Sequence, residues 1–182
     1  MKDGARPVSI VVYSDYVCPW CYVGAAVVDR LAAERPTSVE WRPFFLRPDT
    51  PPEGMRLSAE MQARMGPAHE RLRTMAAEAG LPMVFPDVIP NTRRALEATE
   101  YARVQGRHEP FHRAVAHGYY GEGLDVNAWA VLGSAATEVG LDATEMRRQV
   151  DAGAFRIALD QSIAEARDIG VTAVPTYVID GR

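Results

Sequence analysis

The hydrophobic pattern of the first part of the chain predicts a strand, a helix and a second strand. Residues 8–15 (VSIVVYSD) form a short apolar run rich in β-branched side chains, which is typical of a buried strand. Residues 18–34 then place aliphatic side chains four positions apart, as on one face of a helix, and Pro36 ends that pattern. Residues 38–48 read as a second strand. This order predicts a parallel strand pair joined by a right-handed crossover.

The middle of the chain, from about residue 57 to residue 169, has a helical pattern that glycine and proline interrupt. Asp142 is the predicted N-cap of one of these helices. The pattern returns to a strand at residues 176–179 (TYVI), directly after Val174-Pro175. The predicted helix breaks are Gly66-Pro67, Gly80-Leu81-Pro82, Gly106, Gly121 to Gly123, and Gly140.

Composition and charge are those of an ordinary globular protein. Of the 182 residues, 47% are hydrophobic and 24% are charged, and the formal net charge is −4. The basic residues are scattered rather than clustered, which argues against general nucleic-acid binding. We expect no membrane span, because no run of about 18 apolar residues occurs. The N-terminal MKDGARP has no apolar signal core, so a cytoplasmic location is expected, although a mature secreted form would also lack its signal.

The two cysteines of the chain, Cys18 and Cys21, stand in the stretch Cys-Pro-Trp-Cys. Cys18 lies where the first strand ends and the helix begins, and Pro19 suits the first helical position, where its missing N–H costs nothing. The free N–H groups and the positive end of the helix dipole favour a thiolate there. We therefore expect Cys18 to be exposed, with a depressed pKa. The spacing brings Cys21 onto the same face one turn later.

Three kinds of site have two cysteines at this spacing. A structural disulfide would close so short a loop that it would constrain the unfolded chain little. A zinc site would need further ligands; His108 and His112 have a suitable mutual spacing, but they are distant in sequence and Pro110 separates them. A redox centre needs only the pair itself: one thiolate attacks and the other resolves the mixed disulfide. The sequence favours the redox centre.

Four stretches together resemble a known family: SDYVCPWCYVG, WRPFFLRPD, NTRRALEATEYA and GVTAVPTYVIDG. They are similar to the DsbA-like branch of the thioredoxin superfamily, and most closely to its FrnE-type members. The resemblance covers nearly the whole chain. It implies an α/β thioredoxin fold with a helical insertion between the second and third strands. The expected division is residues 1–50 for the βαβ half, 51–169 for the insertion and its return helix, and 170–182 for the start of the C-terminal half.

The resemblance also implies roles for individual residues. Cys18 would be the nucleophile, Cys21 the resolving thiol, and Pro175 a cis-proline that faces them. Val174 would then leave its backbone free to pair with an extended substrate segment. Trp20 is argued from its position instead: it lies between the two sulfurs and is hard to bury in a tight first helical turn, so it is expected to be an exposed contact for the substrate. The alternative is that Trp20 folds back onto the helical insertion.

The sequence departs from the family pattern in two places. Thioredoxin and DsbA carry an acid six residues before the first cysteine, whereas this chain has Val12 there. Asp15 is the candidate to replace that acid as a proton acceptor for Cys21. The strand and helix that should follow residues 176–179 are missing from this chain, so we expect the natural protein to continue. Without them the last strand presents a free edge, and a homodimer is one outcome that such an edge allows.

Three functions fit these features. The first is a thiol–disulfide oxidoreductase acting on thiol- or disulfide-containing proteins, with glutathione as a further candidate partner. The second is a glutathione-dependent isomerase like the related 2-hydroxychromene-2-carboxylate isomerases, which typically have serine in place of Cys18. The third is a partner-binding module without catalysis. The intact cysteine pair favours the first, and no cofactor or metal is expected.

Overall fold

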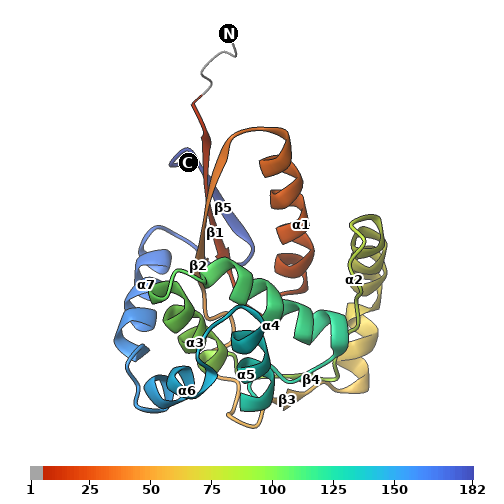
Figure 1. Cartoon of the computed structure of the whole chain (residues 1–182). Coiled ribbons are helices and arrows are strands. Elements are labelled where there is room, and N and C mark those ends of the chain that lie inside the picture. Colours follow the sequence, from red (N-terminus) through yellow and green to blue (C-terminus); the bar gives the residue numbers. More distant parts are fainter. Residues whose placement is uncertain (1–5) are drawn as a thin grey trace.

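A mixed sheet of three strands organises the computed structural model, which describes residues 6–182. The first five residues of the expected 1–50 segment lie outside the described residues. Strands β1 (Val8–Ser14), β2 (Thr37–Pro43) and β5 (Thr176–Ile179) lie in the order β2-β1-β5 (Figure 1). The β1–β2 pair is parallel, as predicted, and β5 runs antiparallel to β1.

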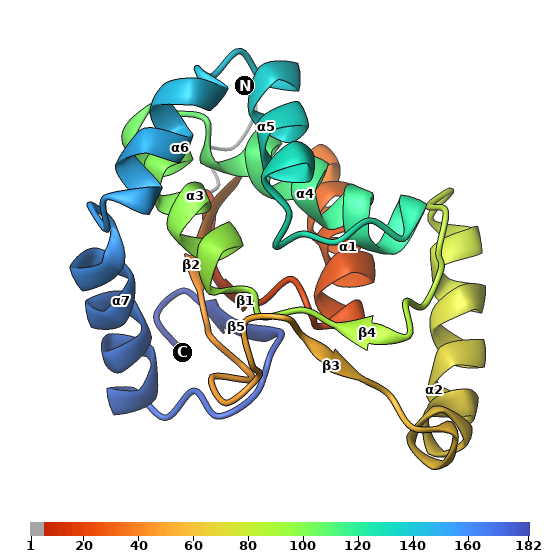
Figure 2. The same ribbon diagram turned by 90° about the horizontal axis from the view of Figure 1, so that it is seen from below.

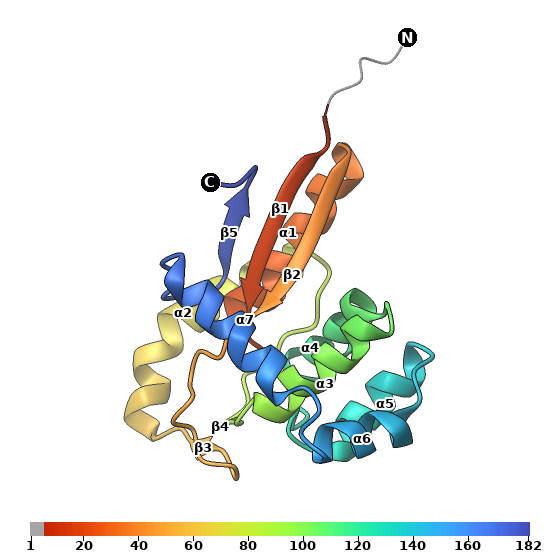
Figure 3. The same ribbon diagram turned by 90° about the vertical axis from the view of Figure 1, so that its left-hand side faces the viewer.

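Helices cover the two faces of this sheet because side chains alternate between the faces along each strand. Helix α1 (Pro19–Glu34) packs through Val28 on the face that carries Ile10 and Val12. On the other face, Tyr13 packs with Ala166, near the end of helix α7 (Arg156–Asp168). Figure 3 shows α1 behind the strands and α7 in front of their lower end.

The segment between β2 and β5 is mainly helical and gathers at one end of the sheet, below it in Figure 1. Two short strands, β3 and β4, pair antiparallel beside these helices (Figure 2). The pattern of residues gave no sign of this pair. The elements of the segment, in chain order, are β3 (Met55–Arg56), α2 (Ala59–Glu78), β4 (Val88–Ile89), α3 (Arg93–Val104), α4 (His108–Glu122), α5 (Trp129–Glu138) and α6 (Ala143–Asp151), followed by α7.

Two boundaries differ from the sequence-based expectations. The second strand ends at Pro43 rather than near residue 48. The predicted break at Gly66-Pro67 is wrong, because α2 continues through Pro67. The helix bends along its length in Figure 2, as expected where a proline lacks its N–H and crowds the carbonyl of the preceding turn. The N-cap prediction for Asp142 is confirmed: its side chain accepts hydrogen bonds from the backbone of Thr144 and Glu145.

A buried polar cluster joins the sheet to the helices of the insertion. His112 lies between the rings of Tyr16 and Trp41, with ring centroids 5.1 Å and 5.0 Å away. Arg103 donates hydrogen bonds to the carbonyl oxygen of Trp41 (2.6 Å) and to Nε2 of His108 (2.9 Å). A guanidinium group thus ties the end of β2 to α3 and α4. Among residues 6–182, no helix is long and apolar enough to cross a membrane.

This cluster should make stability depend on pH. Burial, aided by the nearby guanidinium groups of Arg113 and Arg103, lowers the pKa of His112 from 6.5 to about 4. A histidine with a depressed folded pKa stabilises the fold above its unfolded pKa, and this contribution is lost as the pH falls toward the folded value. From pH 7 to pH 5 the wild type should therefore lose about 2 kcal/mol more unfolding free energy than His112→Phe. Urea denaturation at both pH values measures this, and equal losses would contradict it.

Candidate functional site

Cys18 caps the N-terminus of α1, and Pro19 occupies the first helical turn, as predicted. The backbone of Cys18 is extended, with φ −96° and ψ 107°, and its N–H donates to the carbonyl of Asp15 (3.1 Å). Proline is well placed at this position because its fixed φ is helical and its missing N–H would have had no intrahelical partner. The local sequence therefore places the N-terminus of α1 next to the sulfur of Cys18.

Both cysteines are buried free thiols, each with only 4% of its surface exposed. The expectation that Cys18 is exposed is therefore wrong. The segment before β5 covers Cys18, whose Sγ donates a hydrogen bond to the carbonyl oxygen of Val174 at 3.2 Å. The peptide bond between Val174 and Pro175 is cis, so this proline stands next to the residue that touches the sulfur.

The surroundings make the two thiols unequal. The Cys21 thiol donates a hydrogen bond to Cys18, which is the main cause of the lowered pKa of Cys18; burial opposes it, and the backbone N–H groups of Cys21 and Trp20 also favour the thiolate. Burial raises the pKa of Cys21 well above its ordinary value, and its hydrogen bond to Cys18 raises it further. Cys18 is therefore the sulfur with more thiolate character.

Asp15 is a buried carboxyl group beside the pair, with 1% of its surface exposed. Its Oδ2 accepts a hydrogen bond from the backbone N–H of Leu46 (2.7 Å), whereas Oδ1 has no partner among the described residues. Burial raises the pKa of Asp15 from 3.8 to about 6, and its own backbone N–H faces the Cys21 sulfur. The hydroxyl groups of Ser14 and Thr92 are also buried here, beside Cys21 and Asp15 respectively, where each partly offsets the rise in pKa that burial causes. Behind the sulfurs there is thus an acid that can titrate near neutral pH.

A cavity of about 240 Å³ opens beside Cys18, and Val174 and Trp20 also line it. Trp20 is half-buried rather than exposed, because its ring leans toward α2, where the guanidinium carbon of Arg71 lies 5.7 Å from the ring centroid. The other lining residues come from five segments and are mostly apolar: Val17, Pro19, Leu46, Arg47, Leu57, Met65, Ala68, His69, Leu72, Phe85, Pro86, Ile89, Tyr119 and Tyr120.

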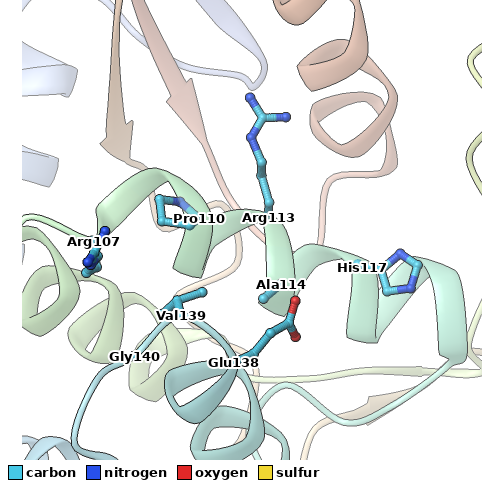
Figure 4. Close-up of a pocket in the computed structure, with 8 residues that line it drawn as sticks. All are labelled: Arg107, Pro110, Arg113, Ala114, His117, Glu138, Val139 and Gly140. Atoms are coloured by element: carbon cyan, nitrogen blue, oxygen red, sulfur yellow. The ribbon is translucent and has the colours of Figure 1, made fainter.

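The remaining features of interest lie elsewhere. A more open cavity of about 660 Å³ between α4 and the end of α5 is lined by both polar and apolar residues and contains no cysteine (Figure 4). His108 and His112 belong to the buried cluster at the end of β2, where Nε2 of His108 accepts from Arg103. Residues 6–182 contain no group of three or more His, Cys, Asp or Glu side chains arranged to hold a metal ion. Geometry thus brings Cys18, Cys21, Pro19, Trp20, Val174, Pro175 and Asp15 together and leaves the histidine pair apart.

Comparison with known proteins extends this picture. The Bacillus subtilis protein YwbO is 30% identical over 175 residues, which span 94% of this chain and 86% of YwbO. A probable DsbA oxidoreductase from Streptomyces coelicolor is 28% identical, with a TM-score of 0.85 over 95% of this chain and 80% of its own. A 2-hydroxychromene-2-carboxylate isomerase shares the fold at 18% identity, with a TM-score of 0.82 over 96% of this chain and 86% of its own.

The cytosolic disulfide reductase DsbM of Pseudomonas aeruginosa, in complex with GSH, also shares the fold. It is 16% identical, with a TM-score of 0.71 over 96% of this chain and 87% of its own. The model of the DSBA-like thioredoxin domain matches residues 9–182, which is nearly the whole chain. The fold expected from the four sequence stretches is therefore confirmed, and the chain belongs to the family of DSBA-like thioredoxin domains.

Proposed function

We propose that the protein is a thiol–disulfide oxidoreductase in which Cys18 is the nucleophile and Cys21 the resolving thiol. The observation that carries this proposal is the unequal pair of thiols at the start of α1, with Cys18 in contact with Val174 and open to a cavity. A thiolate is the attacking species in disulfide exchange, and an adjacent second thiol is what releases the mixed disulfide.

The exchange reaction needs only the sulfurs of Cys18 and Cys21 and a substrate disulfide. The Cys18 thiolate attacks one sulfur of a substrate disulfide, a new bond forms to Cys18, and the other substrate sulfur leaves as a thiolate. Cys21, after losing its proton, attacks Cys18 and expels the second substrate sulfur. The Cys18–Cys21 pair is oxidised and the substrate disulfide is reduced by two electrons; the reverse sequence oxidises a dithiol substrate. The direction depends on the reduction potential of the pair.

Asp15 is our candidate for the proton acceptor of Cys21. The raised pKa of Cys21 means that its thiol needs a base before it can attack. Asp15 is close in the chain, buried, partly unpaired at Oδ1 and able to titrate near pH 6. In this proposal Asp15 fills the role that an acid at position 12 would have in the related proteins.

The cavity beside Cys18 supports a substrate with an apolar group next to its sulfur. Its lining includes no Asp or Glu and one arginine, Arg47, although the chain as a whole is acidic. Trp20 and Val174 would be substrate contacts there. Cysteine-containing proteins with apolar flanking residues fit this surface, and glutathione is a second candidate because DsbM shares the fold. We place the activity in the cytoplasm, where a pair of cysteines is more often catalytic than structural.

Substitution of the cysteines should separate their roles. Cys18→Ser should abolish insulin reduction, because the attacking thiolate is gone, whereas Cys21→Ser should accumulate mixed disulfides that mass spectrometry detects. In the reduced wild type, timed iodoacetamide labelling should modify Cys18 before Cys21. Stable adducts on Cys18→Ser, or faster labelling at Cys21, would reverse the assignment.

Asp15→Asn should raise the unfolding free energy of the protein and slow its disulfide exchange. Since burial raises the folded pKa of Asp15 from 3.8 to about 6, its stabilising effect is present below pH 3.8 and is lost as the pH rises through 6. At pH 8 the variant should be up to about 3 kcal/mol more stable than the wild type, a difference that shrinks toward zero below pH 4. Release of mixed disulfides by Cys21 should slow at the same time. An unchanged release rate would exclude Asp15 as the acceptor.

Filling the cavity tests the substrate class. Ala68 is exposed on α2 and lines the cavity, so Ala68→Trp should occupy space that an apolar substrate group would take. Because burying an apolar side chain contributes about 1.5–3 kcal/mol, kcat/KM for a peptide disulfide flanked by leucine should fall by about tenfold or more. Ala77→Trp, on the same helix but away from the cavity, is the matched control. Equal values in the two variants would show that the cavity does not hold substrate.

A further inference from the structure

Gly24 lies in the interior of α1, three residues after Cys21. Glycine is unfavourable there because it loses more backbone freedom than other residues do when a helix forms. Its backbone is helical and has no positive φ, so the conformation itself does not require glycine. A close approach by another group is then the remaining physical reason for a missing side chain.

The group that approaches is the hydroxyl of Tyr177. A Cβ atom placed on Gly24 would overlap Oη of Tyr177, while it would lie 3.7 Å from Cζ of the same ring and 4.0 Å from Cγ of Pro175. The overlap thus comes from a single oxygen atom, and the rest of the ring would accept a methyl group at ordinary contact distance. Tyr177 therefore rests on the bare backbone of the helix.

Tyr177 belongs to the strand that holds the other half of the site. It lies opposite Val12 in the antiparallel β1–β5 pair, and directly opposed residues point to the same face of a sheet, here the face that α1 covers. Two residues before it stands Pro175, and one further back is Val174, whose carbonyl oxygen accepts the hydrogen bond of Cys18. The Tyr177 ring, with 38% of its surface exposed, thus reaches from the strand to the helix that carries the cysteines.

The electrostatics agree with this placement. Burial raises the pKa of Tyr177 to about 12, and negative charge on Cys21 and Cys18 raises it as well. The phenol therefore stays protonated near neutral pH whether or not the cysteines carry a negative charge. It is a neutral spacer beside two groups whose charge changes.

We propose that Tyr177 is a positioning residue: its hydroxyl, seated on Gly24, sets the distance between α1 and β5 and so holds Val174 against Cys18. The consequence for exchange rests on the function proposed above. The distance between α1 and β5 does not depend on that function.

The test combines Gly24→Ala, Tyr177→Phe and the double variant, with Gly133→Ala on α5 as control, since a Cβ there meets only an ordinary contact at 3.8 Å. Gly24→Ala should push β5 away from α1. Cys18 would then lose both its cover and the carbonyl that holds its proton, and the midpoint of its pH–iodoacetamide profile should fall by about half a unit. Exchange with a peptide disulfide should slow. The profile of Cys21 and that of Gly133→Ala should not move.

Tyr177→Phe should compensate for Gly24→Ala, because it removes the hydroxyl that the added methyl group would overlap. The double variant should return the Cys18 profile to that of Tyr177→Phe, because Cζ leaves room for the methyl. An unshifted profile in Gly24→Ala, or a double variant that keeps the full shift, would overturn the proposal. If Gly24→Ala alone does not fold, a folded double variant supports the proposal and an unfolded one contradicts it. The alkylation profile of Cys18 can be measured without any disulfide exchange. A wild type that exchanges no disulfides would therefore refute the proposed function, while the profile would still test the role of Tyr177.

Discussion

The contact between the start of α1 and the segment before β5 is the interaction on which the rest of the site depends. The Cys18 thiol meets the carbonyl of Val174 at 3.2 Å, although the two residues are 156 positions apart in the chain. The helix supplies a sulfur at its N-terminus, and the strand supplies the cover that buries it. The helices of α2–α7 lie between these segments in sequence and gather at the end of the sheet, where α2, α4 and the segment before β4 wall the cavity beside that sulfur.

The chemical difference between the two thiols follows from their places on α1. Cys18, at the helix N-terminus, has free backbone N–H groups nearby, whereas burial dominates at Cys21, one turn later. Opposite shifts of the two pKa values are what a nucleophile and its resolving partner require. Asp15 adds a carboxyl group with its own raised pKa behind the pair, at a cost in stability that its burial makes unavoidable.

The sequence was sufficient for the elements that local patterns determine. The strand before Cys18, the helix start at Pro19 and the parallel partner strand could all be predicted, because side-chain periodicity and turn residues are local properties. The burial of Cys18 and the contact of Tyr177 with Gly24 could not, since both arise from packing between segments far apart in the chain. The helix through Pro67 shows the same limit: tertiary contacts can hold a helix that a local breaker should end.

The cavity was foreseen only in part. Cys18, Trp20 and Val174 stand in recognisable motifs, whereas Phe85, Tyr119 and their neighbours read as ordinary core residues because nothing in their local sequence marks a surface.

Equilibration of the protein in glutathione buffers of graded potential tests most directly whether Cys18 and Cys21 form a redox-active pair. Cys18 and Cys21 should titrate together as one reversible two-electron couple. A pair that forms no internal disulfide at any glutathione ratio, or that remains glutathionylated at Cys18 alone, would contradict the account.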